Sequence, residues 1–150
     1  MSLVWRLSNG RYSPLDGEGA RRAGGRWNSP GQSAVYTSES LALCLAESLV
    51  HLPGSLPRGY VSFKIFVPDE TIEVLDTSSL RDGWQSDISV TRSVGDQWLT
   101  TQRSLALAVP SVVLPDSTNV LLNPTHPRAK EVRILDQQPF AFDPRLRPAK

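Results

Sequence analysis

Residues 34–51, AVYTSESLALCLAESLVH, decide the fold class because a short strand is followed at once by a helix. The β-branched and aromatic pair near its start predicts the strand, and the hydroxyl side chains after that pair are typical helix N-caps. The apolar run then predicts a helix over about 39–51, which ends before Pro53 and Gly54. Helices so rich in apolar residues are usually buried, so we expect this to be the main buried helix of the protein.

The rest of the chain predicts about six short strands. Apolar residues that alternate with polar ones, or follow each other in short runs, mark strands in six further segments: 3–7, 60–67, 71–76, 104–110, 119–124 and 131–136. Pro110 interrupts the apolar run of 104–115, which indicates an edge, a bulge or a new strand start near Ser111. Strands and helices do not alternate regularly, and this order predicts an α+β fold.

Three segments carry little regular pattern. Residues 91–103 predict only a short irregular helix, because they contain Gly95. Residues 9–31 form a long polar connection, and connections of this length in compact proteins are commonly functional or disordered. Residues 139–150 form an extended basic tail, in which a cluster of three basic residues predicts a solvated end more than a nucleic-acid contact.

The composition fits one soluble domain over residues 1–150, since 39% of the residues are hydrophobic and 21% are charged. The formal net charge of +1 gives no overall field for nucleic acid or an anionic membrane, so we expect neither as a partner. The single cysteine, Cys44, has no disulfide partner, which is typical of a reducing compartment. The sequence shows no signal-peptide pattern and no apolar stretch of membrane-spanning length, so we expect a cytoplasmic protein. The two histidines lack the spacing of metal ligands, so no metal is expected.

Glu47 is the one acidic residue inside the apolar helix. A buried carboxylate is costly unless another group pairs with it or the protein uses it for chemistry. A buried salt bridge to Arg6 or Arg26 is the structural explanation, and a place in an active site is the functional one.

The segment AGGRWNSPG, residues 23–31, is the densest local signal for a ligand. Its paired glycines allow a close approach of the backbone, and they present Arg26, a side chain suited to bidentate contact with phosphate. The segment therefore predicts a site for a pyrophosphate. Alternatively, it is a surface loop in which Trp27 fills the edge of the core and Arg26 stacks on it.

Four further side chains have both a structural and a functional interpretation. Tyr36 either stacks on a flat heterocycle or packs in the core, and packing is the commoner role. His51 lies one helical turn after Glu47 and acts either as a proton shuttle or as a partner of the helix dipole. Ser111 and Asn123 either hydrogen-bond a ligand or satisfy a turn and a strand end.

Taken in order, several motifs resemble the RES domain, the toxin half of bacterial toxin–antitoxin pairs, which is named for an arginine, a glutamate and a serine. The resemblance extends along nearly the whole chain through WRL, GGRWNSPG, AVYTSES, LALCLAE, VGDQWL, VPSVVLP, NVLLNP and FAFDPRL. It implies an ADP-ribosyltransferase-like fold with short mixed or antiparallel strands around a cleft. It also implies that the protein consumes NAD+ as its substrate and needs no metal.

The resemblance places the three family-naming residues on Arg26, Glu47 and Ser111. Ser104 and Ser117 lie near enough in the sequence to compete with Ser111 for the serine. The resemblance and the local motifs together give these candidates for contact with NAD+: Arg26, Trp27, Tyr36, His51 and Asn123.

The implied reaction breaks the bond between nicotinamide and ribose, which leaves positive charge on the ribose, as in glycoside cleavage. Glu47 in a dry cleft would stabilise that charge, Arg26 would hold the pyrophosphate, Tyr36 would stack on nicotinamide, and Ser111 would fix the ribose or nicotinamide end. We expect ADP-ribose to pass to water or phosphate. The alternatives are transfer to a cellular protein and a non-catalytic nucleotide-binding module. The implied partner is an antitoxin with a helix-turn-helix domain of the Xre type.

Overall fold

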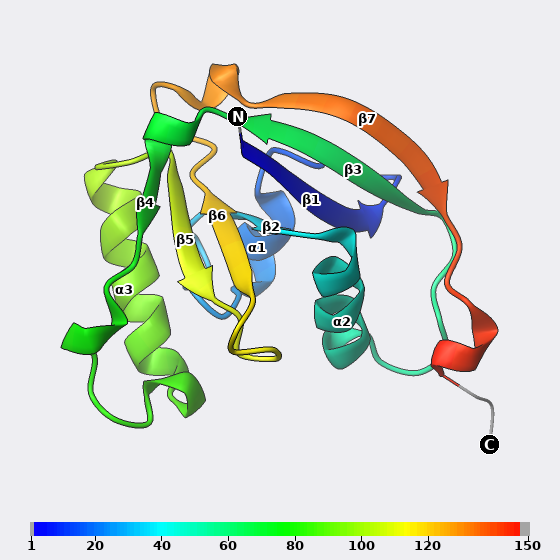
Figure 1. The fold of residues 1–150 in the computed structure, drawn as a ribbon, viewed down its shortest axis with the longest axis horizontal. Coiled ribbons are helices and arrows are strands. Elements are labelled where there is room, and N and C mark those ends of the chain that lie inside the picture. Colours follow the sequence, from blue (N-terminus) through cyan, green and yellow to red (C-terminus); the bar gives the residue numbers. More distant parts are fainter. Residues whose placement is uncertain (1, 148–150) are drawn as a thin grey trace.

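The computed structural model describes residues 2–147, and its central feature is a seven-stranded sheet in the order β4-β5-β6-β2-β1-β3-β7 (Figure 1). The β4 and β5 strands are parallel, and the other neighbours are antiparallel. The strands are β1 (Ser2–Asn9), β2 (Val35–Ser38), β3 (Tyr60–Val67), β4 (Ile72–Val74), β5 (Ala106–Pro110), β6 (Thr118–Leu122) and β7 (Arg133–Phe140). This mixed sheet with few helices confirms the α+β class.

The sheet has two parts, which meet at β1 and β2. The long strands β1, β3 and β7 form one part, and the shorter strands β2, β4, β5 and β6 form the other (Figure 1). Across the junction, the register pairs Trp5 with Ser38, whereas β1 and β3 pair along eight residues. The two parts therefore diverge beyond this junction, and α2 (Leu41–His51) packs beside it against β1 and β2.

Helix α2 begins at Leu41, slightly later than expected. Ser40, one of the hydroxyl side chains expected as a cap, is the N-cap, and its hydroxyl accepts a hydrogen bond from the Leu43 N–H at 3.1 Å. It ends at His51, as expected. The expectation of a deeply buried helix needs correction, because only Leu43 and Cys44 are fully buried and Val50 is 61% exposed. The other apolar side chains lie on a helix that is covered on one side only.

Helix α3 (Ile88–Thr101) corrects a second expectation, because it is a regular helix and longer than α2. It begins before residue 91, since the Asp87 carboxylate accepts a hydrogen bond from the Ser89 N–H at 3.0 Å and caps the first turn. Gly95 is required here rather than disruptive: a Cβ atom on it would lie 1.6 Å from the carbonyl oxygen of Trp27. The glycine lets the loop before β2 press against the helix.

Three smaller differences concern two connections and the last strand. The segment 9–31 contains a short helix, α1 (Glu18–Ala23), which its polar sequence did not reveal. Pro110 ends β5, and the chain then turns at Ser111 rather than starting a new strand. The last strand, β7, extends to Phe140, beyond the expected end at 136. No helix within residues 2–147 is long and apolar enough to cross a bilayer.

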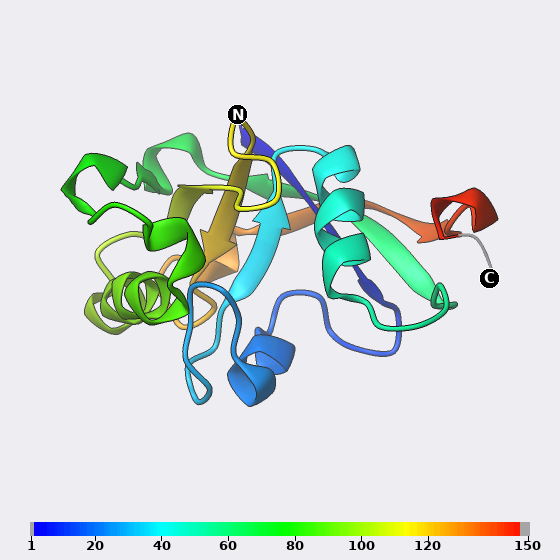
Figure 2. The ribbon, with the colours of Figure 1, turned by 90° about the horizontal axis from the view of Figure 1, so that it is seen from below.

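The core has two clusters because the strands β5 and β6 are covered on both faces. Alternate residues of β5 belong to different clusters: Ala106 and Ala108 pack with Ile65, whereas Leu107 packs with Trp98 of α3. This explains why the segment 104–110 is apolar without alternation. The arrangement fixes α3 over one part of the sheet and leaves the junction of β1 and β2 to α2 and α1 (Figures 1 and 2).

Candidate active site

A pocket of about 720 Å³ lies at the junction of the two parts of the sheet. Residues of α1 and α2, of β1, β2 and β6, and of the glycine loop (residues 23–31) line it. Figure 2 shows how α1 and α2 lie in the fold. Its polar and charged lining residues come from elements far apart in the sequence and include Arg6, Arg26, Tyr36, Ser38, Glu47, Ser48, His51 and Asn119. The volume falls in the range of pockets that bind small molecules and cofactors.

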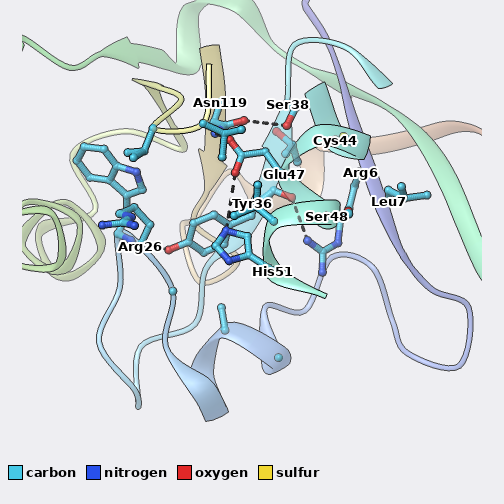
Figure 3. Close-up of a pocket in the computed structure, with 18 of the residues that line it drawn as sticks. Arg6, Leu7, Arg26, Tyr36, Ser38, Cys44, Glu47, Ser48, His51 and Asn119 are labelled. Atoms are coloured by element: carbon cyan, nitrogen blue, oxygen red, sulfur yellow. Dashed lines mark hydrogen bonds and ion pairs between the residues drawn. The ribbon is translucent and has the colours of Figure 1, made fainter. Parts of the chain in front are cut away.

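Glu47 projects from α2 into this pocket, and its side chain is 23% exposed (Figure 3). Its Oε1 atom accepts hydrogen bonds from the Ser111 hydroxyl at 2.6 Å and from the Asn119 amide at 2.8 Å. Its Oε2 atom lies 3.9 Å from His51 Nε2. Among residues 2–147, the basic side chain within 4 Å of the Glu47 carboxylate is thus His51, and no salt bridge to Arg6 or Arg26 is formed.

Ser111 lies behind Glu47 rather than in the pocket wall. Its side chain is only 1% exposed, and its hydroxyl accepts hydrogen bonds from the Val113 and Leu114 N–H groups while it donates to Glu47. The competing serines are placed differently. The Ser104 hydroxyl accepts a hydrogen bond from Trp98 at 2.8 Å, and Ser117 takes part in the same turn as Ser111 through its backbone. The geometry thus favours Ser111 as the serine next to Glu47.

Arg26 lines the same pocket as Glu47, on a loop that α3 holds by its backbone. The Thr91 hydroxyl donates to the Arg26 carbonyl oxygen at 2.5 Å, and Arg92 donates to the Gly25 carbonyl oxygen at 2.9 Å. The guanidinium of Arg26 makes one long hydrogen bond, of 3.4 Å, to the carbonyl oxygen of Gln85. Most of its donors thus remain for a ligand.

Tyr36 lines the pocket with its ring, and its hydroxyl group fastens the glycine loop to β2. The hydroxyl accepts a hydrogen bond from the Trp27 N–H at 2.8 Å and donates to Asn28 at 2.7 Å. Burial raises the pKa of Tyr36 to about 12, so the phenol stays protonated at neutral pH. Gly25 is needed beside it, because a Cβ atom there would lie 2.5 Å from this hydroxyl.

Trp27 fills the edge of the core, as one interpretation of the sequence expected, and it also borders the pocket. It is 2% exposed and packs against Trp84 with ring centroids 5.8 Å apart. Most of the ring therefore fills the core. His51 is also at the pocket, at the end of α2, with its side chain 66% exposed.

Asn123 does not reach the pocket, and this corrects its expected contact with NAD+. It is 1% exposed, its amide donates to the Leu99 carbonyl oxygen at 3.1 Å, and its side-chain oxygen accepts from the Thr125 N–H and hydroxyl. The side chain thus closes the turn after β6. The asparagine that faces the pocket is Asn119, in the same segment.

Arg6 is the main residue of the pocket that the sequence suggested only as a salt-bridge partner. In Figure 3, Glu47 lies between Arg6 and Arg26. One guanidinium nitrogen of Arg6 donates to the Tyr36 carbonyl oxygen at 2.9 Å, but its buried Nε atom has no hydrogen-bond partner among residues 2–147. Burial lowers the pKa of Arg6 from its usual value. The signal in the sequence was a lone arginine within the apolar strand LVWRL.

Cys44 also borders the pocket, but its environment keeps the thiol protonated. Its Sγ atom donates to the Trp5 carbonyl oxygen at 3.1 Å, and burial raises the pKa of the thiol to about 11. It thus serves as a small wall residue rather than as a nucleophile. Among residues 2–147, no group of three or more metal-ligating side chains comes together.

Comparisons with known proteins found a matching family model and similar proteins. The family model described as RES domain matches residues 3–143. The chain is 41% identical over 138 residues to a protein named Prs ADP-ribosylating toxin from Sphingobium sp. (strain YBL2), covering 88% of this chain and 86% of the relative. It is 37% identical over 152 residues to Toxin Res from Yersinia enterocolitica serotype O:8 / biotype 1B, covering 97% of this chain and 99% of the relative.

One solved structure shares the fold. In the crystal structure of the M. tuberculosis MbcT–MbcA toxin–antitoxin complex, the matched chain superposes with a TM-score of 0.74 and 21% sequence identity. The match covers 93% of this chain and 84% of that one. At this identity, the likeness supports the fold and does not by itself transfer an activity.

Proposed function

Because this chain belongs to the RES domain family, we propose that it is the toxin of a bacterial toxin–antitoxin pair and that it consumes NAD+. One observation carries the proposal. A carboxylate, Glu47, and two arginines, Arg6 and Arg26, line a single pocket of about 720 Å³. This set matches the charges that cleavage of a pyrophosphate-bearing nicotinamide nucleotide requires.

Glu47 stabilises the positive charge that forms on the ribose as the bond to nicotinamide breaks. The electron pair of that bond leaves with nicotinamide, which is cationic in NAD+ and departs as a neutral molecule. The reaction thus needs neither a strong general acid nor a metal to release the leaving group. A partly buried carboxylate acts on such charge more strongly than one in bulk water.

Arg6 and Arg26 bind the pyrophosphate. The Arg26 side chain is held by one long hydrogen bond only, and the buried Arg6 Nε atom lacks an acceptor within the described residues. An unsatisfied buried donor costs free energy, and an anionic ligand in the pocket supplies the missing acceptor. The ring of Tyr36 gives the pocket a flat wall on which nicotinamide stacks.

The acceptor of ADP-ribose is water or phosphate in this proposal, so that the reaction degrades NAD+. A second candidate is transfer to a cellular protein, which the relative named Prs ADP-ribosylating toxin favours at 41% identity. His51, with its side chain 66% exposed at the pocket, lies where either acceptor would enter.

The cognate antitoxin is the proposed partner, and the cytoplasm is the proposed compartment. The likeness of the fold to a chain from a toxin–antitoxin complex supports the partner. We further propose that this antitoxin carries a helix-turn-helix domain of the Xre type, since the formal net charge of +1 gives the toxin no strong attraction to DNA of its own. Pull-down with the product of the adjacent gene tests this point, and a toxin without such a neighbour contradicts it.

Incubation of the purified protein with NAD+ labelled in the adenosine half tests the activity. We expect free nicotinamide and labelled ADP-ribose or its phosphate, with Glu47→Gln as the inactive control. Label on a macromolecule instead supports the second candidate. Tight binding with NAD+ recovered intact contradicts both and identifies a nucleotide-binding module.

A further inference from the structure

The two oxygens of the Glu47 carboxylate have different surroundings. Oε1 accepts two short hydrogen bonds, from Ser111 at 2.6 Å and from Asn119 at 2.8 Å. For Oε2, the near protein group is His51 Nε2 at 3.9 Å, which is beyond hydrogen-bond distance. One oxygen is therefore committed to the protein, and the other is open toward the pocket.

The hydroxyl of Ser111 has a single direction in which to donate. It accepts hydrogen bonds from the N–H groups of Val113 at 3.2 Å and of Leu114 at 3.0 Å. These two bonds use its acceptor capacity, so its proton points to Glu47.

The amide of Asn119 is fixed from its other end. Ser38 on β2 pairs with Asn119 on β6 in the sheet register, and the Ser38 hydroxyl donates to the Asn119 side-chain oxygen at 2.8 Å (Figure 3). An amide whose oxygen accepts from Ser38 presents its NH2 group to the opposite side, where Glu47 lies. Ser38 is 4% exposed, so this donor is shielded from exchange with water.

We propose that Asn119, oriented by Ser38, is a positioning residue that together with Ser111 holds Oε1 of Glu47 and leaves Oε2 as the oxygen that meets the substrate. The assignment rests on the proposed function, since it names the oxygen that faces the developing charge on the ribose. Hydrogen bonds behind a functional group fix its orientation, and small misplacements are costly in rate. Asn119 borders the pocket, but both ends of its amide are already engaged within the protein.

Nicotinamide release and NAD+ affinity, measured on the same variants, test this role. In Asn119→Ala, we expect kcat to fall on the order of 10²-fold, because the carboxylate loses one of its two anchors. The dissociation constant for NAD+ should stay within about threefold of the wild-type value, since the pyrophosphate contacts are intact. Ser38→Ala should lower kcat in the same direction by about tenfold, as a change behind the positioning residue.

Two further variants separate a positioning role of Asn119 from an effect on folding and from an unspecific loss of activity. Asn119→Asp keeps the shape and can still accept from Ser38, but it replaces the donor to Glu47 by an acceptor, so kcat should fall at least as far as in Asn119→Ala. Ser117→Ala is the matched control: Ser117 lies in the same turn as Ser111 but contributes backbone atoms to its hydrogen bonds. Its kcat should equal that of the wild type.

The outcomes distinguish this inference from the proposed function. A wild-type protein that releases no nicotinamide contradicts the function. An active wild type with an unchanged kcat in Asn119→Ala, or with a weakened NAD+ affinity at unchanged kcat, overturns the positioning role. Ligand-free crystal structures of the wild type and of Asn119→Ala provide a readout without turnover: the carboxylate should rotate in the variant, and an unmoved carboxylate contradicts the proposal even if the enzyme is inert.

Discussion

Helices α2 and α3 differ in a way that reverses what their sequences suggest. The α2 sequence, LALCLAESLVH, is mostly apolar, yet only two of its residues are fully buried. The α3 sequence, ISVTRSVGDQWLTT, is mostly polar, yet Thr91, Gly95, Trp98 and Leu99 are buried in it. The side of α2 that carries Glu47 and His51 borders the pocket, whereas polar side chains of α3 hold the loop before β2. An apolar sequence can therefore belong to a helix that is covered on one side only and borders a pocket.

This comparison predicts that changes in α2 alter the chemistry and changes in α3 alter stability and loop position. Glu47→Gln gives the largest expected effect, a loss of NAD+ turnover on the order of 10³-fold, because a neutral amide does not stabilise a developing cation. The melting temperature should change little, since the variant is nearly isosteric and the side chain is partly exposed. Nicotinamide release and thermal unfolding measure both; a folded variant with retained turnover contradicts the assignment.

Gly95→Ala in α3 should mainly reduce stability. The added Cβ atom would meet the Trp27 carbonyl oxygen at 1.6 Å, so the helix and the glycine loop must separate. We expect a loss of about 3 kcal/mol in the free energy of unfolding, together with weaker NAD+ binding. Urea denaturation measures the loss. Gly19→Ala in α1 is the matched control, since nothing lies within 4 Å of its added Cβ atom and alanine favours a helix.

Asp96→Asn in α3 should also reduce stability and NAD+ binding, but by less than Gly95→Ala. The Asp96 carboxylate accepts hydrogen bonds from the Ser29 N–H at 2.9 Å and from the Ser29 hydroxyl at 2.5 Å. These bonds tie the end of the glycine loop to α3. Losing this charge-assisted contact should lower the free energy of unfolding by about 1–2 kcal/mol. It should also raise the KM for NAD+ severalfold with little change in kcat. Gln97→Ala, at an exposed position next to it, should leave both unchanged; a fall in kcat alone would assign Asp96 a different role.

The smallest effect concerns Cys44 of α2. Because burial raises the pKa of this thiol to about 11, only about one molecule in 10³ to 10⁴ carries the thiolate at pH 7.5. Alkylation of the folded protein should thus be slow, rise about tenfold per pH unit up to that pKa, and become fast on unfolding in urea. The pKa of the thiol is higher in the folded protein than in the unfolded chain, so folding favours the neutral thiol. Its contribution to stability is therefore complete below about pH 9 and declines as the pH rises toward 11. Rapid labelling of the native protein at neutral pH would contradict this environment.

Much of the fold could be predicted from local patterns. Strand β3 lies where alternation placed it, and α2 ends at the predicted residue. Helix α3 could not be predicted with the same success, because Gly95 lowers helix propensity and its benefit comes only from contact with Trp27, a residue far away in the sequence. Tertiary contact overrides local propensity at such positions.

Some residues of the candidate site could be predicted from the sequence, and others only from the folded chain. Glu47 and Arg26 stand out in the sequence, because an acid in an apolar helix and an arginine after two glycines are unusual locally. Asn119 and Asn123 could not be distinguished, since both lie in or next to one short strand and only the folded chain shows which of them faces the pocket. Ser38 is a further example, because its contact depends on the register between β2 and β6.

The junction between β1 and β2 carries a consequence for how the protein is made. Arg6 is supplied by the first strand, Arg26 by the loop before the second, and Asn119 by the sixth, so a chain that ends before β6 lacks part of the pocket. A ribosome must release the sequence well past β6 before the residues around Glu47 can meet. Products that end before β6 therefore lack Asn119 and should not show the proposed NAD+ turnover.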